Sequence, residues 1–323
     1  MALRFIDFCA GIGAGRLGLE RHGLQCVAYS EINEKAVTSY KLLHDTGSEI
    51  ECGDLTKING DTLPQFDIMI AGFPCQTFSI VGKRKGFDDE RGQIIYSLIK
   101  LLKTKNIPYF IFENVKGLVN HDKGRTIEVI VKTLDDAGYD VEFKVLNSLN
   151  YGVPQMRERV YFIGVRKDLV LKEKRFDWPR EMAMPDIKNY LVDDNNVISE
   201  NVQKTLERYL NNKYNKGEYT IRQLLENEYS VLDTRQSDLR IYTGKVPTLR
   251  TGRKGILYVR DGKLRSLTGY ESLLLQGFDR EYAEKIRDRV SESTLLAQTG
   301  NAMTVTVVDA LCKSLLDYVV EGK

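Results

Sequence analysis

Residues 5–15 read FIDFCAGIGAG, an apolar run that ends in three glycines at alternate positions. The run has the hydrophobicity of a buried strand. The glycines at 11, 13 and 15 allow the backbone to turn tightly and to approach a ligand closely. A glycine-rich turn between a first strand and a helix is typical of α/β folds that bind nucleotide-like cofactors. Alone the pattern is weak, because a purely structural turn has the same composition.

Strand-like and helix-like segments alternate through the first half of the chain. Apolar runs predict strands at 3–8, 25–30, 68–71, 109–113, 141–146 and 160–165. Apolar residues at three- and four-residue steps predict helices at 33–44, 93–103 and 126–137. Strands that are apolar on both faces are typical of a sheet covered by helices on both sides. We therefore predict an α/β domain with a doubly wound, mostly parallel sheet of the Rossmann-like type.

The composition changes near Trp178 and Pro179. The following region is polar and interrupted, with a helix expected around 200–210 and a hairpin-like set of strands from 239 to 259. Helical patterns return after 267, and 305–319 predicts a closing amphipathic helix. We expect three parts: a main domain of residues 1–178 plus 298–323, a smaller β-rich domain at 179–263 and a hinge region at 264–297.

The totals exclude several classes of protein. The 323 residues are 42% hydrophobic and 28% charged. No apolar run reaches the roughly 18 residues of a membrane helix, and no signal-peptide pattern is present. Five cysteines without a C-x-x-C pair predict free thiols in a reducing cytosol. Three histidines without metal-ligand spacing predict no metal site.

One acidic residue follows the second predicted strand, and another belongs to a Gly-Asp pair later in the chain. Glu31 comes directly after the 25–30 strand, where a carboxylate can accept hydrogen bonds from ribose hydroxyls. Asp54 could accept one from an adenine amino group, and Phe8 could stack on adenine. Each acid alone would usually be a solvated loop residue, but together they indicate an adenosine-containing cofactor. NAD fits less well than S-adenosylmethionine, because Arg16 stands where G-x-G-x-x-G needs its third glycine.

A proline–cysteine turn ends the 68–71 strand, at the edge where α/β enzymes build active sites. A buried cysteine is commonly an inert small hydrophobe. Cys75 differs, because it follows Pro74 and precedes a loop whose residues 83–85 are Lys-Arg-Lys. Nearby positive charge favours the thiolate form, so Cys75 is a candidate nucleophile.

Further polar residues cluster at strand ends. Glu113 and Asn114 end the fourth predicted strand, where a lone glutamate often caps a helix but can also donate a proton to a substrate. Gln155, Arg157 and Arg159 occupy alternate positions, which share one face of an extended segment. One arginine would commonly form a structural salt bridge, whereas three donors on one face suit a planar, oxygen-bearing ring.

The region from Asp233 to Arg265 is basic, with nine lysines and arginines against three aspartates, or +6. A charge run is usually a solvated surface. Its interleaved Gly, Thr and Tyr residues also suit a β-ribbon that faces phosphates.

Together these features resemble the cytosine-C5 DNA methyltransferases, especially the compact bacterial enzymes of restriction–modification systems. The resemblance rests on DFCAGIGAG, Glu31, Gly53-Asp54, GFPCQTFS, GFDDERG, ENV, QMRER, RSLTGYESLLLQGF and QTGNAMTV. PCQ-x-FS followed by ENV and Q-x-R-x-R is a specific combination, and the motifs cover nearly the whole chain apart from roughly 170–262. The family's GNS is GNA here, which removes a hydroxyl at Ala302, and Ile32 stands where some members place Trp.

The resemblance implies the fold of S-adenosylmethionine-dependent methyltransferases, a target-recognition domain at 179–263, and chemistry on a cytosine flipped out of double-stranded DNA. Cys75 would attack C6 of that cytosine, and C5 would then take the methyl group. Glu113 would contact N3 and the exocyclic amine, and Arg159 the O2 carbonyl, with Arg157 in support. The implied cofactor contacts are Phe8, Gly11, Gly13, Glu31, Ile32, Asp54, Leu55, Pro74 and Asn301. The implied contacts to cytosine or DNA are Gln76, Ser79, Asn114, Gln155, Thr248, Leu249 and Arg250.

We expect a monomer in the bacterial cytosol or nucleoid. The alternative function is an RNA (tRNA) cytosine-C5 methyltransferase with the same catalytic centre. The basic stretch mildly favours duplex DNA over RNA as the substrate. A non-catalytic binding protein is disfavoured because the cysteine, the glutamate and both arginines are present. An NAD oxidoreductase would leave PCQTFS unexplained.

Overall fold

The structure is a computed structural model that describes residues 2–73, 93–171, 175–252 and 254–320. The chain divides into two compact units. The first contains Met1–Asn147, Glu158–Glu181 and Ala302–Lys323; the second contains Ser148–Arg157 and Met182–Asn301. The predicted hinge region therefore lies inside the second unit.

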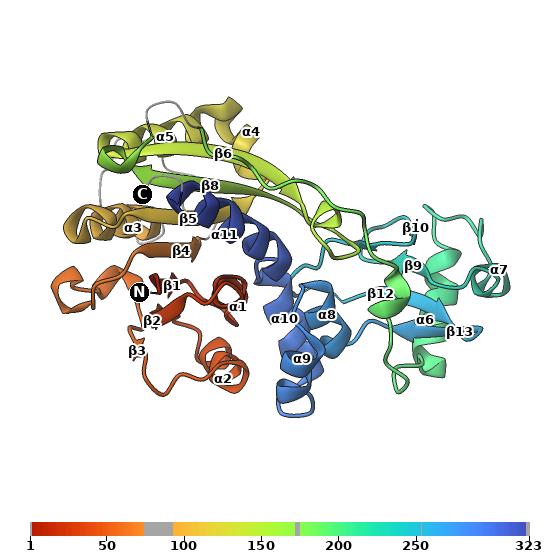
Figure 1. Cartoon of the computed structure of the whole chain (residues 1–323). Coiled ribbons are helices and arrows are strands. Elements are labelled where there is room, and N and C mark those ends of the chain that lie inside the picture. Colours follow the sequence, from red (N-terminus) through yellow and green to blue (C-terminus); the bar gives the residue numbers. More distant parts are fainter. Residues whose placement is uncertain (1, 74–92, 172–174, 253, 321–323) are drawn as a thin grey trace. The chain divides into compact units, whose positions relative to one another are not determined.

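The first unit is built on a seven-stranded sheet with the strand order β3-β2-β1-β4-β5-β8-β6. The strands are β1 (Arg4–Phe8), β2 (Gln25–Ser30), β3 (Ile50–Glu51), β4 (Ile68–Gly72), β5 (Tyr109–Val115), β6 (Tyr139–Asn147) and β8 (Glu158–Arg166). The pairs from β3 to β5 are parallel, whereas β8 runs antiparallel to β5 and β6. Figure 1 shows β4, β5, β8 and β6 side by side in this order. The predicted mostly parallel sheet is confirmed.

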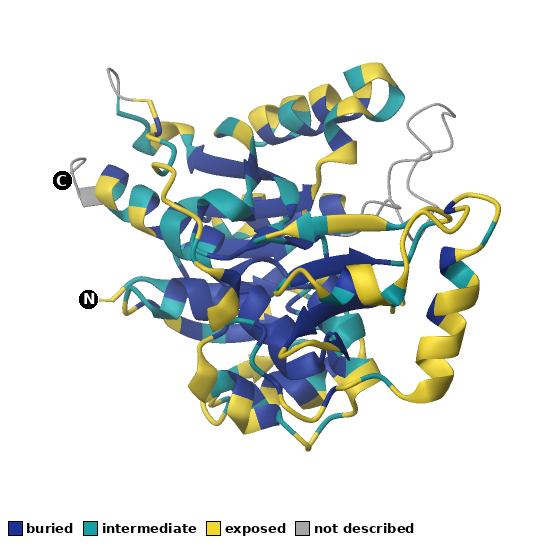
Figure 2. Ribbon diagram, turned by 90° about the vertical axis from the view of Figure 1, so that its right-hand side faces the viewer, coloured by how far each residue is buried: buried dark blue, intermediate teal, exposed yellow. Residues whose placement is uncertain are grey.

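Helices cover both faces of this sheet because its strands are apolar on both sides. On one face lie α1 (Ala14–Glu20) and α11 (Val305–Val320), with Gly15 against Ile70 and Gly18 against Val308. On the other face α3 (Gln93–Lys105) and α5 (Arg125–Asp136) pack on a core that includes Met69. The remaining helices of the unit are α2 (Glu34–Leu43) and α4 (Gly117–Asn120). Figure 2 shows the dark-blue, buried strands of the sheet.

The second unit contains a four-stranded antiparallel sheet, in the order β10-β9-β12-β13, and a short parallel pair, β7 with β11. Its strands are β7 (Gln155–Met156), β9 (Ser230–Asp233), β10 (Arg240–Thr243), β11 (Val246–Pro247), β12 (Ile256–Arg260) and β13 (Lys263–Ser266). Its helices are α6 (Glu200–Leu210), α7 (Ile221–Leu225), α8 (Gly269–Leu275), α9 (Arg280–Ile286) and α10 (Glu292–Asn301).

The predicted hairpin-like set of strands over 239–259 is confirmed in that β10 and β12 lie there, but the hairpin pairing is wrong. The strands β10 and β12 do not pair with each other, since both pair with β9. The strand β9 cannot be predicted from an alternating pattern, because its four residues are all buried. Consecutive strands pair antiparallel at β9–β10 and at β12–β13, and the second of these hairpins turns at Asp261 and Gly262. Both residues have positive φ, 54° and 63°, as the tight turn of a two-residue hairpin requires.

Within the described ranges, no helix combines the length and apolar character needed to cross a bilayer. The four cysteines in those ranges carry free thiols. No group of three His, Cys, Asp or Glu side chains among the same residues could hold a metal ion.

Candidate active site

A buried ion pair lies at the carboxyl end of β5. The Glu113 carboxylate is 3.0 Å from Nε of Arg159, and the two side chains are only 9% and 14% exposed. The antiparallel register brings them together, because the start of β8 pairs with the end of β5. Gly72, the last residue of β4, is opposite Glu113 and leaves space beside its carboxylate. The first unit therefore presents a carboxylate and a guanidinium side by side at one edge of its sheet.

Asn114 anchors the end of β4. Its Nδ2 donates a hydrogen bond of 2.9 Å to the carbonyl of Phe73, and its Oδ1 accepts one of 2.8 Å from the N–H of Val115. The side chain is buried, so it holds Phe73 in place at the end of β4. Four predicted site residues follow there and lie outside the described residues: Pro74, Cys75, Gln76 and Ser79.

The glycine turn after β1 is held by hydrogen bonds that leave one peptide group available. The N–H of Gly13 donates to the carbonyl of Ala10 at 2.8 Å, and the N–H of Gly11 donates to Oε2 of Glu31 at 2.8 Å. Within the described part of the chain, the Gly11 carbonyl and the Ile12 N–H have no hydrogen-bond partner. A Cβ at Gly11 would meet no atom within 4 Å, and its φ is +57°. The Cα of Gly11 therefore borders open space.

Glu31 links the first two strand ends. Besides Gly11, its carboxylate accepts hydrogen bonds from the N–H groups of Ile32, at 2.9 Å, and Asn33, at 2.8 Å. Three donors orient it and use three of its roughly four lone-pair positions. One ribose hydroxyl can bind without disturbing the network, whereas binding two requires one of these contacts to give way. The adjacent Ile32 is 73% exposed, which leaves its apolar side chain available to cover a ring.

The other predicted cofactor residues lie in different surroundings. Asp54 caps a short 3₁₀ turn (Leu55–Lys57), and the hydrogen bond from the Thr56 hydroxyl helps to hold the pKa of Asp54 below its usual range. Leu55 is buried, and so is Phe8, which packs in the core near Phe66. An adenine could reach the Phe8 ring only after a neighbouring side chain moves. Asn301 is exposed and belongs to the second unit.

In the second unit, Gln155 holds the Thr248-Leu249 pair. Its Oε1 accepts a hydrogen bond from the N–H of Leu249 at 3.1 Å, and its Nε2 donates to the Leu275 carbonyl at 2.8 Å. The Thr248 hydroxyl donates to the Met156 carbonyl at 2.6 Å. The alignment of β11 with β7 thus fixes this segment by both backbone and side-chain contacts.

Arg157 completes the hold on the same segment. It is 1% exposed, and its guanidinium donates to the carbonyls of Leu249, at 3.1 Å, and Gly300, at 3.3 Å. A Cβ at Gly300 would lie 2.3 Å from the Thr251 nitrogen, so only glycine fits there. The guanidinium of Arg157 thus binds backbone carbonyls. Its supporting role in a cytosine pocket stays a prediction.

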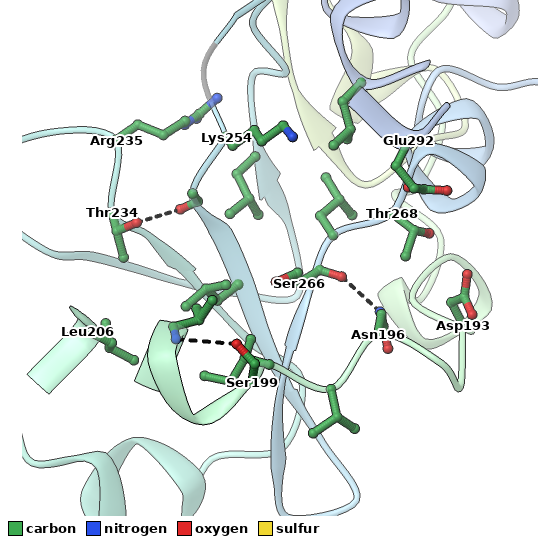
Figure 3. A pocket seen from close by; sticks show the side chains of 18 of the residues that line it. Asp193, Asn196, Ser199, Leu206, Thr234, Arg235, Lys254, Ser266, Thr268 and Glu292 are labelled. Carbon is green, nitrogen blue, oxygen red and sulfur yellow. Dashed lines mark hydrogen bonds between the residues drawn. The ribbon is translucent and has the colours of Figure 1, made fainter. Parts of the chain in front are cut away.

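A large cavity of about 850 Å³ adjoins this segment within the second unit. Figure 3 shows Arg235 and Lys254 along one rim and Thr268, Asp193 and Glu292 along the other. Arg235 is paired with Asp233 at 2.7 Å and donates to the Thr248 carbonyl. Arg250 and Lys254, by contrast, are exposed and form no hydrogen bond or ion pair with described residues. These two cations are available to bind phosphates or base edges.

Glu271 is a buried carboxyl that ties several elements of the second unit together. It accepts hydrogen bonds from the Tyr258 hydroxyl at 2.6 Å, from the Asp193 N–H at 3.0 Å and from the Thr268 N–H at 3.1 Å. Burial raises the pKa of Glu271 to about 7, although these hydrogen bonds act in the opposite direction. Glu271 is not among the predicted site residues, although the Thr268-x-x-Glu271 capping box before an apolar run is a usable signal for it.

We predict that Glu271 makes the second unit less stable as the pH rises. The unfolded carboxyl loses its proton near pH 4.5, whereas the folded one keeps it until about pH 7. The stabilisation is therefore complete below about pH 4.5 and is lost as the pH rises to about 7, by on the order of 3 kcal/mol. In Glu271→Gln, the difference between urea unfolding midpoints at about pH 5 and about pH 8 should shrink. An unchanged difference would contradict this role.

A second acid that the sequence analysis missed is Asp7, inside the apolar β1. Its side chain has no exposed surface, and burial raises the pKa of its carboxyl well above the usual range, while the charge of Arg16 opposes the shift. An aspartate within the run FIDF was the available signal.

The fold is a doubly wound α/β domain, with a glycine turn after β1 and a carboxylate–guanidinium pair at the carboxyl end of β5. The C-5 cytosine-specific DNA methylase family matches residues 3–317, so the chain belongs to that family and is a cytosine-C5 DNA methyltransferase. It is 33% identical over 335 residues to the Type II methyltransferase M.HhaI of Haemophilus parahaemolyticus, covering 97% of this chain and 94% of that protein.

Two further similarities are informative. The orphan methyltransferase M.Rho11sI of Bacillus phage rho11s is 36% identical over 241 residues, which span 69% of this chain but 47% of that protein. A solved putative DNA modification methyltransferase from an Escherichia coli prophage superposes with a TM-score of 0.71 at 20% identity, covering 99% of this chain and 100% of that one. At that identity the likeness supports the fold alone.

Proposed function

We propose that this enzyme transfers a methyl group from S-adenosylmethionine to C5 of a cytosine flipped out of double-stranded DNA, through a covalent adduct between Cys75 and C6. The observation that carries the proposal is the buried pair of Glu113 and Arg159 at the sheet edge. The hydrogen-bonding edge of cytosine presents an amine, a ring nitrogen and a carbonyl. A carboxylate and a guanidinium side by side match that edge, and a base within the duplex stack could not reach them.

The chemistry assigns a role to each group. The Cys75 thiolate adds to C6, and the electrons of the C5–C6 double bond make C5 nucleophilic as N3 takes a proton. Glu113 supplies that proton to N3 and takes it back when the adduct breaks down; it also accepts a hydrogen bond from the amine, while Arg159 binds the O2 carbonyl. S-adenosylmethionine supplies the methyl group when bound. A base then removes the C5 proton, the double bond re-forms, and the thiolate leaves.

The residues around the glycine turn fit this cofactor. The unoccupied N–H of Ile12 can donate to the carboxylate of the methionine part, while Glu31 accepts a hydrogen bond from the ribose. The exposed Ile32 covers the adenine, and Asp54, when it turns from its cap, accepts from the adenine amine. Asn301 stays a predicted cofactor contact.

We assign DNA recognition to the second unit, where the Thr248-Leu249 segment is fixed and Arg250 and Lys254 are exposed. A fixed segment followed by exposed cations can hold a register on the phosphate backbone or read guanine. Like the Type II methyltransferases it resembles, the enzyme would act in a restriction–modification system in the cytoplasm.

We predict that Arg250→Gln and Lys254→Gln each weaken DNA binding and flatten its salt dependence. Removing one cation from a phosphate should reduce the slope of log K against log salt by about 0.9. Fluorescence anisotropy with a labelled duplex at several salt concentrations measures this slope. Lys132→Gln, which removes an exposed lysine on α5, is the control and should leave the slope unchanged. If both test variants keep the wild-type slope, neither Arg250 nor Lys254 contacts a phosphate of the DNA.

The experiment for the proposal compares nucleic acids as methyl acceptors. The enzyme is incubated with S-adenosylmethionine labelled in its methyl group and with either genomic DNA or total tRNA, and the labelled nucleosides are separated. We expect 5-methylcytosine in DNA only. Label in tRNA alone would establish the RNA methyltransferase instead, and no label in either, with cofactor still bound, would indicate a binding protein.

A further inference from the structure

A buried histidine lies directly behind the glycine turn. The side chain of His44, which follows α2, has no exposed surface, and its Nε2 is 3.1 Å from the carbonyl oxygen of Ile12. Because a carbonyl can only accept, Nε2 must carry the hydrogen of this bond. The proposed function uses the turn but gives His44 no role.

The ring of His44 is fixed on several sides. It packs on Tyr40 with ring centroids 4.8 Å apart, and Tyr40 in turn stacks on Tyr29 at 4.3 Å. Its Nδ1 is 3.9 Å from Oε2 of Glu20, a distance too long for a hydrogen bond. Arg16 approaches the Tyr40 ring from α1 and binds Glu20 as well. This packing leaves the imidazole little freedom to turn away from Ile12.

The same ring touches Gly13. A Cβ at Gly13 would lie 2.2 Å from Nε2 of His44 and 2.9 Å from Tyr40, and the φ of Gly13 is +79°. Only glycine can therefore occupy this position while His44 keeps its place. The turn and the histidine fit each other closely.

These contacts fix the orientation of the backbone N–H and C=O groups in the turn. The peptide group between Ile12 and Gly13 is held at both ends, by His44 on its carbonyl and by Ala10 on its N–H. The peptide group between Ala10 and Gly11 is held likewise, by Gly13 and by Glu31. In the turn from Ala10 to Gly13, this leaves the peptide group between Gly11 and Ile12 for a ligand, and its orientation follows from its two fixed neighbours.

We propose that His44 is a positioning residue for the cofactor: its hydrogen bond to the Ile12 carbonyl locks the glycine turn so that the Ile12 N–H faces the bound S-adenosylmethionine. The inference rests on the proposed cofactor site at this turn. It concerns cofactor affinity and not the chemical step, because His44 touches neither the cofactor nor the cytosine.

The test compares two replacements by isothermal titration with S-adenosylhomocysteine and by steady-state kinetics. His44→Leu removes the donor and should weaken cofactor binding about tenfold, as expected for one buried hydrogen bond. The KM for S-adenosylmethionine should rise equally, while kcat and the KM for DNA stay near wild type. His44→Gln keeps an amide N–H within reach of Ile12 and should recover most of the affinity.

His22→Leu is the matched control, since His22 hydrogen-bonds to Asp309 at the other end of α1. It should bind the cofactor as wild type does. Wild-type affinity in His44→Leu would overturn the inference, as would an equal loss in His44→Gln, which would indicate packing alone. A wild-type enzyme that binds no S-adenosylhomocysteine would instead contradict the proposed function.

A measurement on the unaltered protein covers the case in which His44→Leu does not fold. The chain has three histidines, so their imidazole nitrogens can be distinguished in a long-range ¹H–¹⁵N NMR spectrum. We expect Nε2 of His44 to be protonated and its signal to shift when S-adenosylhomocysteine binds. An unprotonated Nε2, or a signal that the ligand leaves unchanged, would overturn the inference.

Discussion

Glu113→Gln is expected to lower methyl transfer about a thousandfold while cofactor binding stays unchanged. The amide keeps the volume of the carboxylate but cannot share a proton with N3 of the cytosine. It also leaves the guanidinium of Arg159 without its 3.0 Å charge partner. Single-turnover rates at saturating DNA and cofactor measure the effect, because they isolate chemistry from product release.

Asp168→Asn is the control for this variant. It breaks an exposed ion pair with Arg166 at the opposite end of β8 and should change neither rate nor stability appreciably, because exposed pairs contribute little. Thermal unfolding of Glu113→Gln shows whether the loss of rate reflects loss of fold. A folded Glu113→Gln enzyme within about tenfold of the wild-type rate would contradict the assigned role.

Cys75→Ser should abolish nearly all methyl transfer, by about a thousandfold or more, while S-adenosylhomocysteine still binds. A serine hydroxyl is almost wholly protonated at neutral pH and is a far weaker nucleophile than a thiolate, so C6 would stay unattacked. Cys312→Ala, in the buried interior of α11, is the control and should remain active once its stability is allowed for. Near-normal activity of Cys75→Ser would remove the nucleophile from the mechanism.

Much of the fold could be predicted because its signals are local. The predicted 25–30 strand and the 200–210 helix match β2 and α6, since a continuous apolar run and a polar helix with apolar steps are visible in short windows. The short, fully buried β9 and the exposed β3 show neither pattern, so the sequence does not reveal them. The Asp261-Gly262 turn is a readable hairpin signal, but the predicted hairpin lies earlier in the chain.

In the candidate site, the sequence predicts which residues are polar and near strand ends, but not which partners they bind. The predicted strands put Glu113 at the end of one strand and Arg159 just before another, and they lie near those ends of β5 and β8. The antiparallel pairing of β8 with β5 brings the two side chains together. Alternate spacing grouped Arg157 with Arg159, yet the structure pairs one with carbonyls of the second unit and the other with Glu113. Partners so distant in sequence cannot be read from spacing. His44 belongs to no motif, because its role depends on contact with a loop 32 residues away.

The measurement that tests the central claim most directly is a covalent trap. Release of the enzyme requires loss of the C5 proton, and a fluorine at C5 cannot leave in its place, so the methylated adduct should persist. Duplex DNA copied with 5-fluorocytosine in place of cytosine is incubated with the enzyme and S-adenosylmethionine, then run on a denaturing gel. The account predicts a protein–DNA complex that needs the cofactor and is absent with Cys75→Ser. Methylation of ordinary DNA without any trapped complex, or an equal complex with Cys75→Ser, would contradict it.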